Sequence, residues 1–286
     1  MSEPDPLEPL VPLSHLAPEE KAARAGSFGG AAALYERYRP GPRPAAVDWL
    51  LPAPVGTVVD LGAGTGALSR LLLERAREVI AVEPDDRMRA ILIEEVPGAR
   101  AVKGRGESMP IPDRSVDAVV ASSSWHWMDP IPTLHEVGRI LLPDGIIGAV
   151  WSGPDPDGPF LVQAQALLAE RSQGGDAEGG GIADLLTGDA RRPLPTLEIP
   201  VGVPFDQPEH EVFTWDIALN ADELIGLLGT FSWLITMPDA TRERVLAEAR
   251  RLLRELLGVE GEVTVDVAFR ADAWRARRIE AEGAGH

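Results

Sequence analysis

The sequence predicts an α/β fold, in which helices cover both faces of a doubly wound, mostly parallel sheet. Three observations lead to this prediction. Between residues 57 and 151, short β-branched apolar segments alternate with segments whose apolar residues recur at helical spacing. A glycine-rich turn joins the first strand-like segment directly to the first helix-like one. The 286 residues, 44% of them hydrophobic, are enough to bury the core that such a sheet requires.

Five strands are expected in this block, because each segment is short and apolar, as is typical of parallel strands buried on both faces. They are residues 57–61, 78–82, 100–103, 115–121 and 146–151. Apolar spacing predicts one helix after Gly66 and a second one capped by Asp85 or Asp86. A third helix begins at Pro130, with Asp129 as its N-cap.

The segments on either side of this block carry further elements. A proline-rich arm (1–18) precedes short helices interrupted by glycines (19–38) and a short helix (45–51). Beyond residue 151 we expect helices over 160–171, 221–228 and 241–257, and strands over 211–218 and 263–270. The glycine- and proline-rich residues 172–204 predict a loop or lid.

Composition argues against several classes of function. A formal net charge of −18 opposes binding to a phosphate backbone, so no nucleic-acid partner is expected. The absence of cysteine excludes disulfides and thiolate chemistry, and the histidines and carboxylates lack metal-ligand spacing, so no metal is expected. No apolar run is long enough to cross a membrane and the N-terminal segment does not resemble a signal peptide. We therefore expect a cytoplasmic protein with no membrane partner; its oligomeric state stays open, with a homo-oligomer as one alternative.

The glycine turn carries most of the functional information. Gly62 and Gly64 allow a tight turn and close approach of a ligand. Asp60 ends the first strand, where its carboxylate would repel a pyrophosphate and attract an ammonium group, unless it only caps a helix or turn. Glu83 ends the second strand, where it can accept hydrogen bonds from both hydroxyls of a ribose. This pair favours S-adenosylmethionine, which has no phosphate, over NAD, which the Gly-x-Gly-x-x-Ala pattern leaves as an alternative.

These residues resemble those of class I S-adenosylmethionine-dependent methyltransferases. The markers are VVDLGAGTG (58–66), VEP (82–84), GRGESMPIPDRSVDAV (104–119) and WHWMD (125–129). Together with SFGGAAALYERYRPG (27–41), the WHWMD segment is similar to the small-molecule branch, the type 11 or trans-aconitate methyltransferase-like proteins. The resemblance implies a Rossmann-like sheet of seven strands in the order 3-2-1-4-5-7-6, with strand seven antiparallel.

The resemblance also implies a division of the chain and a set of cofactor contacts. Residues 1–54 would form the N-terminal arm and cofactor-covering helices, 55–152 the S-adenosylmethionine-binding core, and 153–286 a lid and substrate region that completes the sheet. Asp60 would face the amino group and Glu83 the ribose. The remaining implied contacts are Tyr38, Arg39, Gly62, Ala63, Gly64, Met88, Gly106, Glu107, Ser108, Ser122 and Trp127.

His126 is the candidate catalytic residue. It follows the fourth strand, and its ordinary pKa suits a general base at neutral pH, although the alternative is that it braces the loop. Trp125, His210 and Trp233 are candidate substrate-binding residues. The alternative for Trp125 is that it packs under the cofactor or braces the loop, and the alternative for Trp233 is core packing.

The expected activity is transfer of a methyl group to a small-molecule acceptor, with a secondary metabolite among the options. Three alternatives stay open: an RNA or protein acceptor, a non-methylating S-adenosylmethionine-binding protein, and an NAD-dependent oxidoreductase. Residues 151–286 hold −12 of the −18 net charge. If part of this charge lines the pocket, a neutral or cationic acceptor is favoured over a polycarboxylate.

Overall fold

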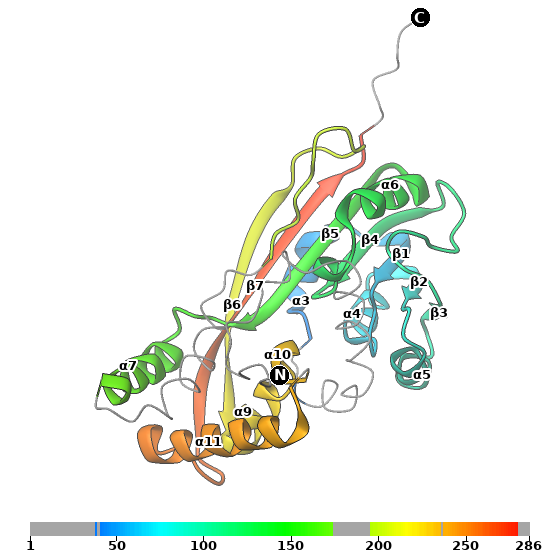
Figure 1. The fold of residues 1–286 in the computed structure, drawn as a ribbon. Coiled ribbons are helices and arrows are strands. Elements are labelled where there is room, and N and C mark those ends of the chain that lie inside the picture. The colour runs from blue at the N-terminus through cyan, green and yellow to red at the C-terminus, as the bar shows by residue number, and fades with distance from the viewer. Residues whose placement is uncertain (1–37, 39–40, 174–194, 236, 280–286) are drawn as a thin grey trace, which may run out of the picture.

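The predicted α/β class and strand order are both confirmed. The computed structural model describes residue 38 and residues 41–173, 195–235 and 237–279. Its seven strands form one sheet of order β3-β2-β1-β4-β5-β7-β6 (Figure 1). The strands are β1 (Val55–Leu61), β2 (Ala76–Val82), β3 (Arg100–Val102), β4 (Val116–Ser122), β5 (Leu141–Pro154), β6 (Glu209–Asn220) and β7 (Thr264–Arg277).

The longer helices lie in the expected places, whereas the short elements η3 and α10 were not predicted. They are α3 (Pro44–Leu50), α4 (Ala67–Leu72), α5 (Asp86–Glu95), the 3-10 turn η3 (Trp125–Trp127), α6 (Pro130–Ile140), α7 (Pro159–Gln173), α9 (Ala221–Leu228), α10 (Ser232–Ile235) and α11 (Asp239–Leu257). Asp85 caps α5 by accepting a hydrogen bond from the backbone N–H of Arg87. The arm at 1–18, the helices at 19–37 and most of the 172–204 loop lie outside the described residues.

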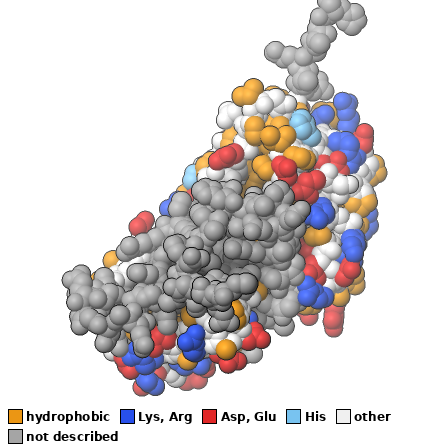
Figure 2. Space-filling view, in the orientation of Figure 1, with side chains coloured by type: hydrophobic (Ala, Val, Ile, Leu, Met, Phe, Trp, Pro, Cys, Tyr) orange, Lys and Arg blue, Asp and Glu red, His pale blue; other side chains and the backbone are white. Residues whose placement is uncertain are grey.

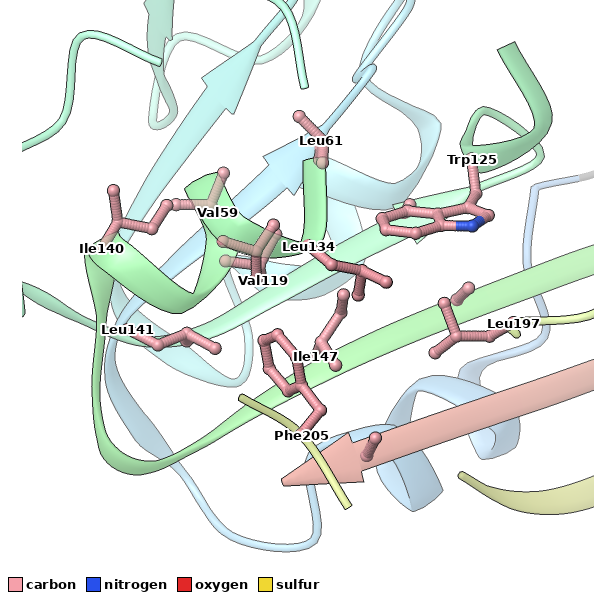
Figure 3. Packing of buried hydrophobic residues seen from close by; sticks show 14 of the residues in the cluster. Val59, Leu61, Val119, Trp125, Leu134, Ile140, Leu141, Ile147, Leu197 and Phe205 are labelled. Carbon is pink, nitrogen blue, oxygen red and sulfur yellow. The ribbon is translucent and has the colours of Figure 1, made fainter. Parts of the chain in front are cut away.

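The sheet is buried on both faces. On one face, α6 and residues 197–205 cover a cluster that includes Val59, Leu134, Ile147 and Phe205 (Figure 3). On the other face, α3 and α4 cover a second cluster that includes Leu50 and Val120. This double cover explains the continuous apolar runs of β1 and β4, because a strand between two helix layers has no solvent-facing side.

The last strand is longer than predicted. β7 was expected to end at Arg270, but it continues to Arg277 and pairs antiparallel with β5 from Pro154 back to Ile146. Small residues, Ala271 and Ala273, face the α3 side in this extension, and charged residues interrupt the apolar alternation on which the prediction rested. β6 pairs with β7 along its whole length.

The antiparallel pair of β6 and β7 extends past the end of β5. β5 pairs with residues 269–277 of β7, whereas β6 pairs with residues 264–275, so the two outer strands continue alone. Helices α7, α9 and α11 gather around this extension (Figure 1). Within the described part of the chain, no helix combines the length and apolarity needed to cross a membrane.

Candidate functional site

Three glycines of the turn after β1 have left-handed backbone conformations, with φ of +70° at Gly62, +58° at Gly64 and +96° at Gly66. A Cβ added at Gly62 would lie 2.6 Å from Cβ of Ser124, and one added at Gly66 would lie 2.6 Å from a methyl of Val96. At Gly64 the nearest described atom is Sδ of Met88, at 4.0 Å. Gly62 and Gly66 therefore permit close packing of the protein on itself, whereas an added Cβ at Gly64 would meet no described atom closer than 4.0 Å.

Asp60 is a buried carboxylate whose two oxygens differ. It lies at the end of β1, is 1% exposed, and accepts a hydrogen bond of 2.5 Å at Oδ2 from the hydroxyl of Ser69 on α4. Oδ1 is buried and has no hydrogen-bond partner among the described residues. Burial raises the pKa of Asp60 to about 7; the Ser69 hydrogen bond opposes this shift and the nearby Glu83 adds to it.

Glu83 joins the turns that follow β1 and β2. Its Oε2 accepts from the backbone N–H of Gly64 at 2.9 Å, and its Oε1 accepts from that of Asp85 at 2.8 Å. The side chain is 5% exposed, and burial raises its pKa even though both hydrogen bonds favour the ionised form. Since each carboxylate oxygen has two lone pairs, Glu83 can still accept hydrogen bonds from a ligand.

The loop after β4 is fixed to the end of β1. The hydroxyl of Ser124 donates a hydrogen bond of 2.6 Å to the carbonyl of Leu61. Trp125 is 5% exposed and packs in the core with Leu134 and Leu197 (Figure 3). Trp125 is therefore a core residue of this loop, and its contact with the substrate stays a prediction.

His126 is hydrogen-bonded to Trp151, which the sequence analysis had placed in a strand without assigning it a role in the site. The indole Nε1 of Trp151, on β5, donates to Nδ1 of His126 at 3.0 Å. The ring of Trp127 lies against the imidazole, with 4.8 Å between ring centroids. His126 and Trp127 are both half-buried, and Ser122, also half-buried, ends β4 next to this loop.

The residues after β3 mainly support the loop after β4. Oε1 of Glu107 accepts from the backbone N–H of Asp129 at 2.9 Å, at the start of α6. A Cβ added at Gly106 would lie 2.6 Å from Sδ of Met128, so this glycine is packed against that loop. Ser108 is exposed.

Tyr38 lies against α9. A Cβ added at Gly226 would lie 2.5 Å from Cδ1 of Tyr38, so the tyrosine ring covers this glycine. Arg39 lies outside the described residues, and of Trp233 the structure describes the position in α10 but not the side chain.

His210 belongs to an ionic network on β6 and β7. It bonds Asp272 at 2.8 Å and stacks on Trp274 with ring centroids 4.0 Å apart. Arg270 donates to both oxygens of Asp272, and these two partners hold the pKa of Asp272 below its ordinary value despite its burial. The network escaped the sequence analysis because Asp272 lies beyond the predicted end of the strand. Among the described side chains no group of three or more could hold a metal ion.

Comparison with known proteins decides the family. Residues 59–149 match a model described as a methyltransferase domain. An uncharacterised methyltransferase of Mycobacterium tuberculosis is 36% identical over 227 residues, which cover 79% of this chain and 85% of that protein. The chain belongs to the methyltransferase family. The activity is that of an S-adenosylmethionine-dependent methyltransferase and not that of an NAD-dependent oxidoreductase.

Two further similarities bear on this methyltransferase. A malonyl-[acyl-carrier protein] O-methyltransferase of Pectobacterium atrosepticum is 34% identical over 157 residues, covering 54% of this chain and 58% of that one. A solved structure from Anaeromyxobacter dehalogenans, provisionally named a type II methyltransferase, has a TM-score of 0.56 at 23% identity and covers 85% of this chain and all of that one. The structural likeness shows that the two proteins share a fold.

Proposed function

We propose that this methyltransferase acts on a small molecule, and that the crevice between the carboxyl ends of β1, β2 and β4 holds its cofactor. The proposal depends chiefly on one observation: at the end of β1, just before the glycine turn, the carboxylate of Asp60 keeps one buried oxygen without a partner among the described residues. In strand order, β1 and β4 are neighbours at the point where the chain reverses direction across the sheet, and ligands of open α/β sheets bind there.

The residues present fit S-adenosylmethionine. Oδ1 of Asp60 is an acceptor for an ammonium group, and Glu83 has lone pairs left for ribose hydroxyls. Gly62, Ala63 and Gly64 would lie along the methionine part, with Ser122 beside it and Met88 next to the adenine. When bound, S-adenosylmethionine supplies an electrophilic methyl group; the chain's own residues bind and orient the acceptor, and such positioning can supply much of the catalysis.

Four other residues would contribute to the cofactor site, two directly and two indirectly. Tyr38 would cover the cofactor from α9, and Trp127 would border it from the loop after β4. Gly106 and Glu107 would act indirectly, by holding that loop through Met128 and Asp129. We keep Ser108 and Arg39 as predicted cofactor contacts.

A small-molecule acceptor is favoured over a nucleic acid by charge. On the face shown in Figure 2, the described Lys and Arg side chains are interspersed with Asp and Glu and form no continuous basic stripe. The net charge of −18 points the same way. His210, near the start of β6, and Trp233, in α10, stay candidates for the substrate wall. A cytoplasmic location stays a prediction from the sequence.

The test is a binding measurement followed by a methyl-transfer screen. Calorimetry of the full chain should detect S-adenosylmethionine binding, which Asp60→Ala and Glu83→Ala should each weaken, while the exposed substitution Asp239→Ala should not. A metabolite library is then screened with the wild-type protein for a mass gain of one methyl group. Normal affinity in both site variants would place the cofactor elsewhere, and transfer only to RNA or protein would refute the small-molecule acceptor.

A further inference from the structure

The hydrogen bond between Trp151 and His126 fixes which nitrogen of the neutral imidazole carries the proton. An indole Nε1–H can only donate a hydrogen bond, so Nδ1 of His126 must be the acceptor and must be unprotonated. The 3.0 Å distance is normal for an N–H donor. In the neutral ring the proton then lies on Nε2, because a neutral imidazole has one protonated and one unprotonated nitrogen.

We infer that His126 presents Nε2–H as a hydrogen-bond donor to an oxygen or nitrogen acceptor atom of the methyl-accepting substrate, and that Trp151 is the positioning residue that sets this tautomer. The substrate contact rests on the proposed function, but the tautomer does not. For Nε2 to take a proton from the substrate as a base, the ring would need its existing proton on Nδ1. That proton would point at the indole N–H, and two donors would face each other.

Trp151 is held firmly enough to impose this choice. It is 3% exposed and packs in the cluster that contains Trp125 and Leu197. On β5 it pairs directly with Asp272 of β7, whose carboxylate is already bonded by Arg270 and His210. The sheet therefore fixes the backbone of Trp151, and the core fixes its side chain.

The imidazole is held from its own side as well. Within η3, Trp127 N–H donates to the carbonyl of Ser124 at 3.0 Å, and Ser124 is tied to Leu61 at the end of β1. His126 therefore follows β4 at a fixed distance from the glycine turn that follows β1. Both loops border the crevice assigned to the cofactor, so a donor on this ring is placed to orient an acceptor beside it.

The donor role limits what His126 contributes to the chemistry. In the transfer, a lone pair of the acceptor atom forms the new bond to the methyl carbon, and the electron pair of the broken S–C bond stays on sulfur. Where the acceptor carries a proton, that proton leaves to water and not to Nε2 of His126. The contribution of His126 is orientation of the acceptor, and its loss should act on methyl transfer more than on cofactor affinity.

The tautomer is tested by ¹⁵N NMR of the histidine side chains in the uniformly labelled full chain, with the His126 signals assigned by their loss in His126→Gln. We expect Nε2 protonated and Nδ1 unprotonated at neutral pH. Trp151→Phe should abolish the preference, and the matched control Trp274→Phe should keep it, since no described partner bonds Nε1 of Trp274. A wild-type ring that is protonated at Nδ1 would overturn the inference, and this measurement does not depend on a variant folding.

The substrate contact is tested by comparing two substitutions, with the acceptor found in the metabolite screen. His126→Gln keeps an N–H donor near the position of Nε2, whereas His126→Ala removes it. We expect Gln to stay within about tenfold of wild-type turnover and Ala to lose about 10²-fold, the size of one preorganised donor. Equal losses would favour a base and overturn the donor role. Absence of transfer by wild type, despite cofactor binding, would refute the proposed function and this contact together, while the NMR result would still decide the tautomer.

Discussion

The hydroxyl of Ser69 bonds Oδ2 of Asp60 at 2.5 Å, and the other oxygen of the same carboxylate is buried with no partner that the structure describes. Hydrogen bonding by Ser69 does not offset the loss of hydration, so burial raises the pKa of Asp60 from its ordinary value of 3.8 to about 7. Near neutral pH this group is therefore divided between its charged and neutral forms. A cationic ligand at Oδ1 would favour the charged form.

Asp60 should make the folded protein less stable as pH rises. Because its folded pKa of about 7 exceeds its ordinary value of 3.8, the folded state binds more protons between these values, and its contribution to the free energy of unfolding falls as pH rises from about 4 to 7. Asp60→Asn cannot ionise. We expect its stability relative to wild type to increase from pH 5 to pH 8, measured by urea unfolding. The exposed control Asp239→Asn should show no such trend, and a constant difference for Asp60→Asn would contradict the raised pKa.

Cofactor binding should release a proton near pH 7. If the ammonium group pairs with Asp60, it stabilises the carboxylate and lowers the pKa of Asp60 in the complex, so the protonated fraction must give up its proton. Calorimetry with S-adenosylmethionine in two buffers of different ionisation enthalpy measures this release directly. We expect release by wild type and none by Asp60→Asn. Equal binding enthalpies in the two buffers for wild type would show that the ligand does not act on this group.

The α/β class and the residues at the ends of β1 and β2 could be predicted because their signals are local, whereas the strand order was implied by the family resemblance. Asp60 and Glu83 each end a short apolar run, and parallel strands bring such ends to one edge of the sheet. The hydrogen bond between Trp151 and His126 could not be predicted. It joins residues 25 apart on β5 and on the loop after β4, and the relative position of these two elements is set by tertiary packing.

Two other features of the structure could not be predicted for the same physical reason. Glu107 stays a predicted cofactor contact, but the sequence did not show that one of its oxygens accepts a hydrogen bond from the backbone at Asp129, 22 residues away. The extension of β7 was missed because Arg270 and Asp272 pair with each other on one face, which hides the strand period from an apolar pattern. Charged residues that pair with one another on one face of a strand look like loop residues when only the sequence is read.

Alanine substitution at Gly64 and at Gly261 should distinguish an effect on cofactor binding from the cost of backbone strain. Gly64 and Gly261 have nearly equal φ, +58° and +57°, and an added Cβ meets nothing closer than 4.0 Å in the described part of either site. Alanine at either position should therefore lower the free energy of unfolding by a similar amount, about 1–2 kcal/mol, for the left-handed conformation. Only Gly64→Ala should weaken S-adenosylmethionine in calorimetry. Wild-type affinity in Gly64→Ala would show that no ligand approaches this glycine.

The effect of Gly226→Ala on the free energy of unfolding should change sign when the Tyr38 ring is removed. Glycine inside a helix normally costs about 1 kcal/mol relative to alanine, so Gly226→Ala on α9 should stabilise the protein if nothing lay against it. The Tyr38 ring does lie there, 2.5 Å from the position of an added Cβ. We expect Gly226→Ala to destabilise wild type, to displace Tyr38 and to weaken S-adenosylmethionine binding, yet to stabilise the Tyr38→Ala background. Urea unfolding of the four proteins in this double-mutant cycle measures the coupling, and additive effects would show that the ring does not rest on α9 in solution.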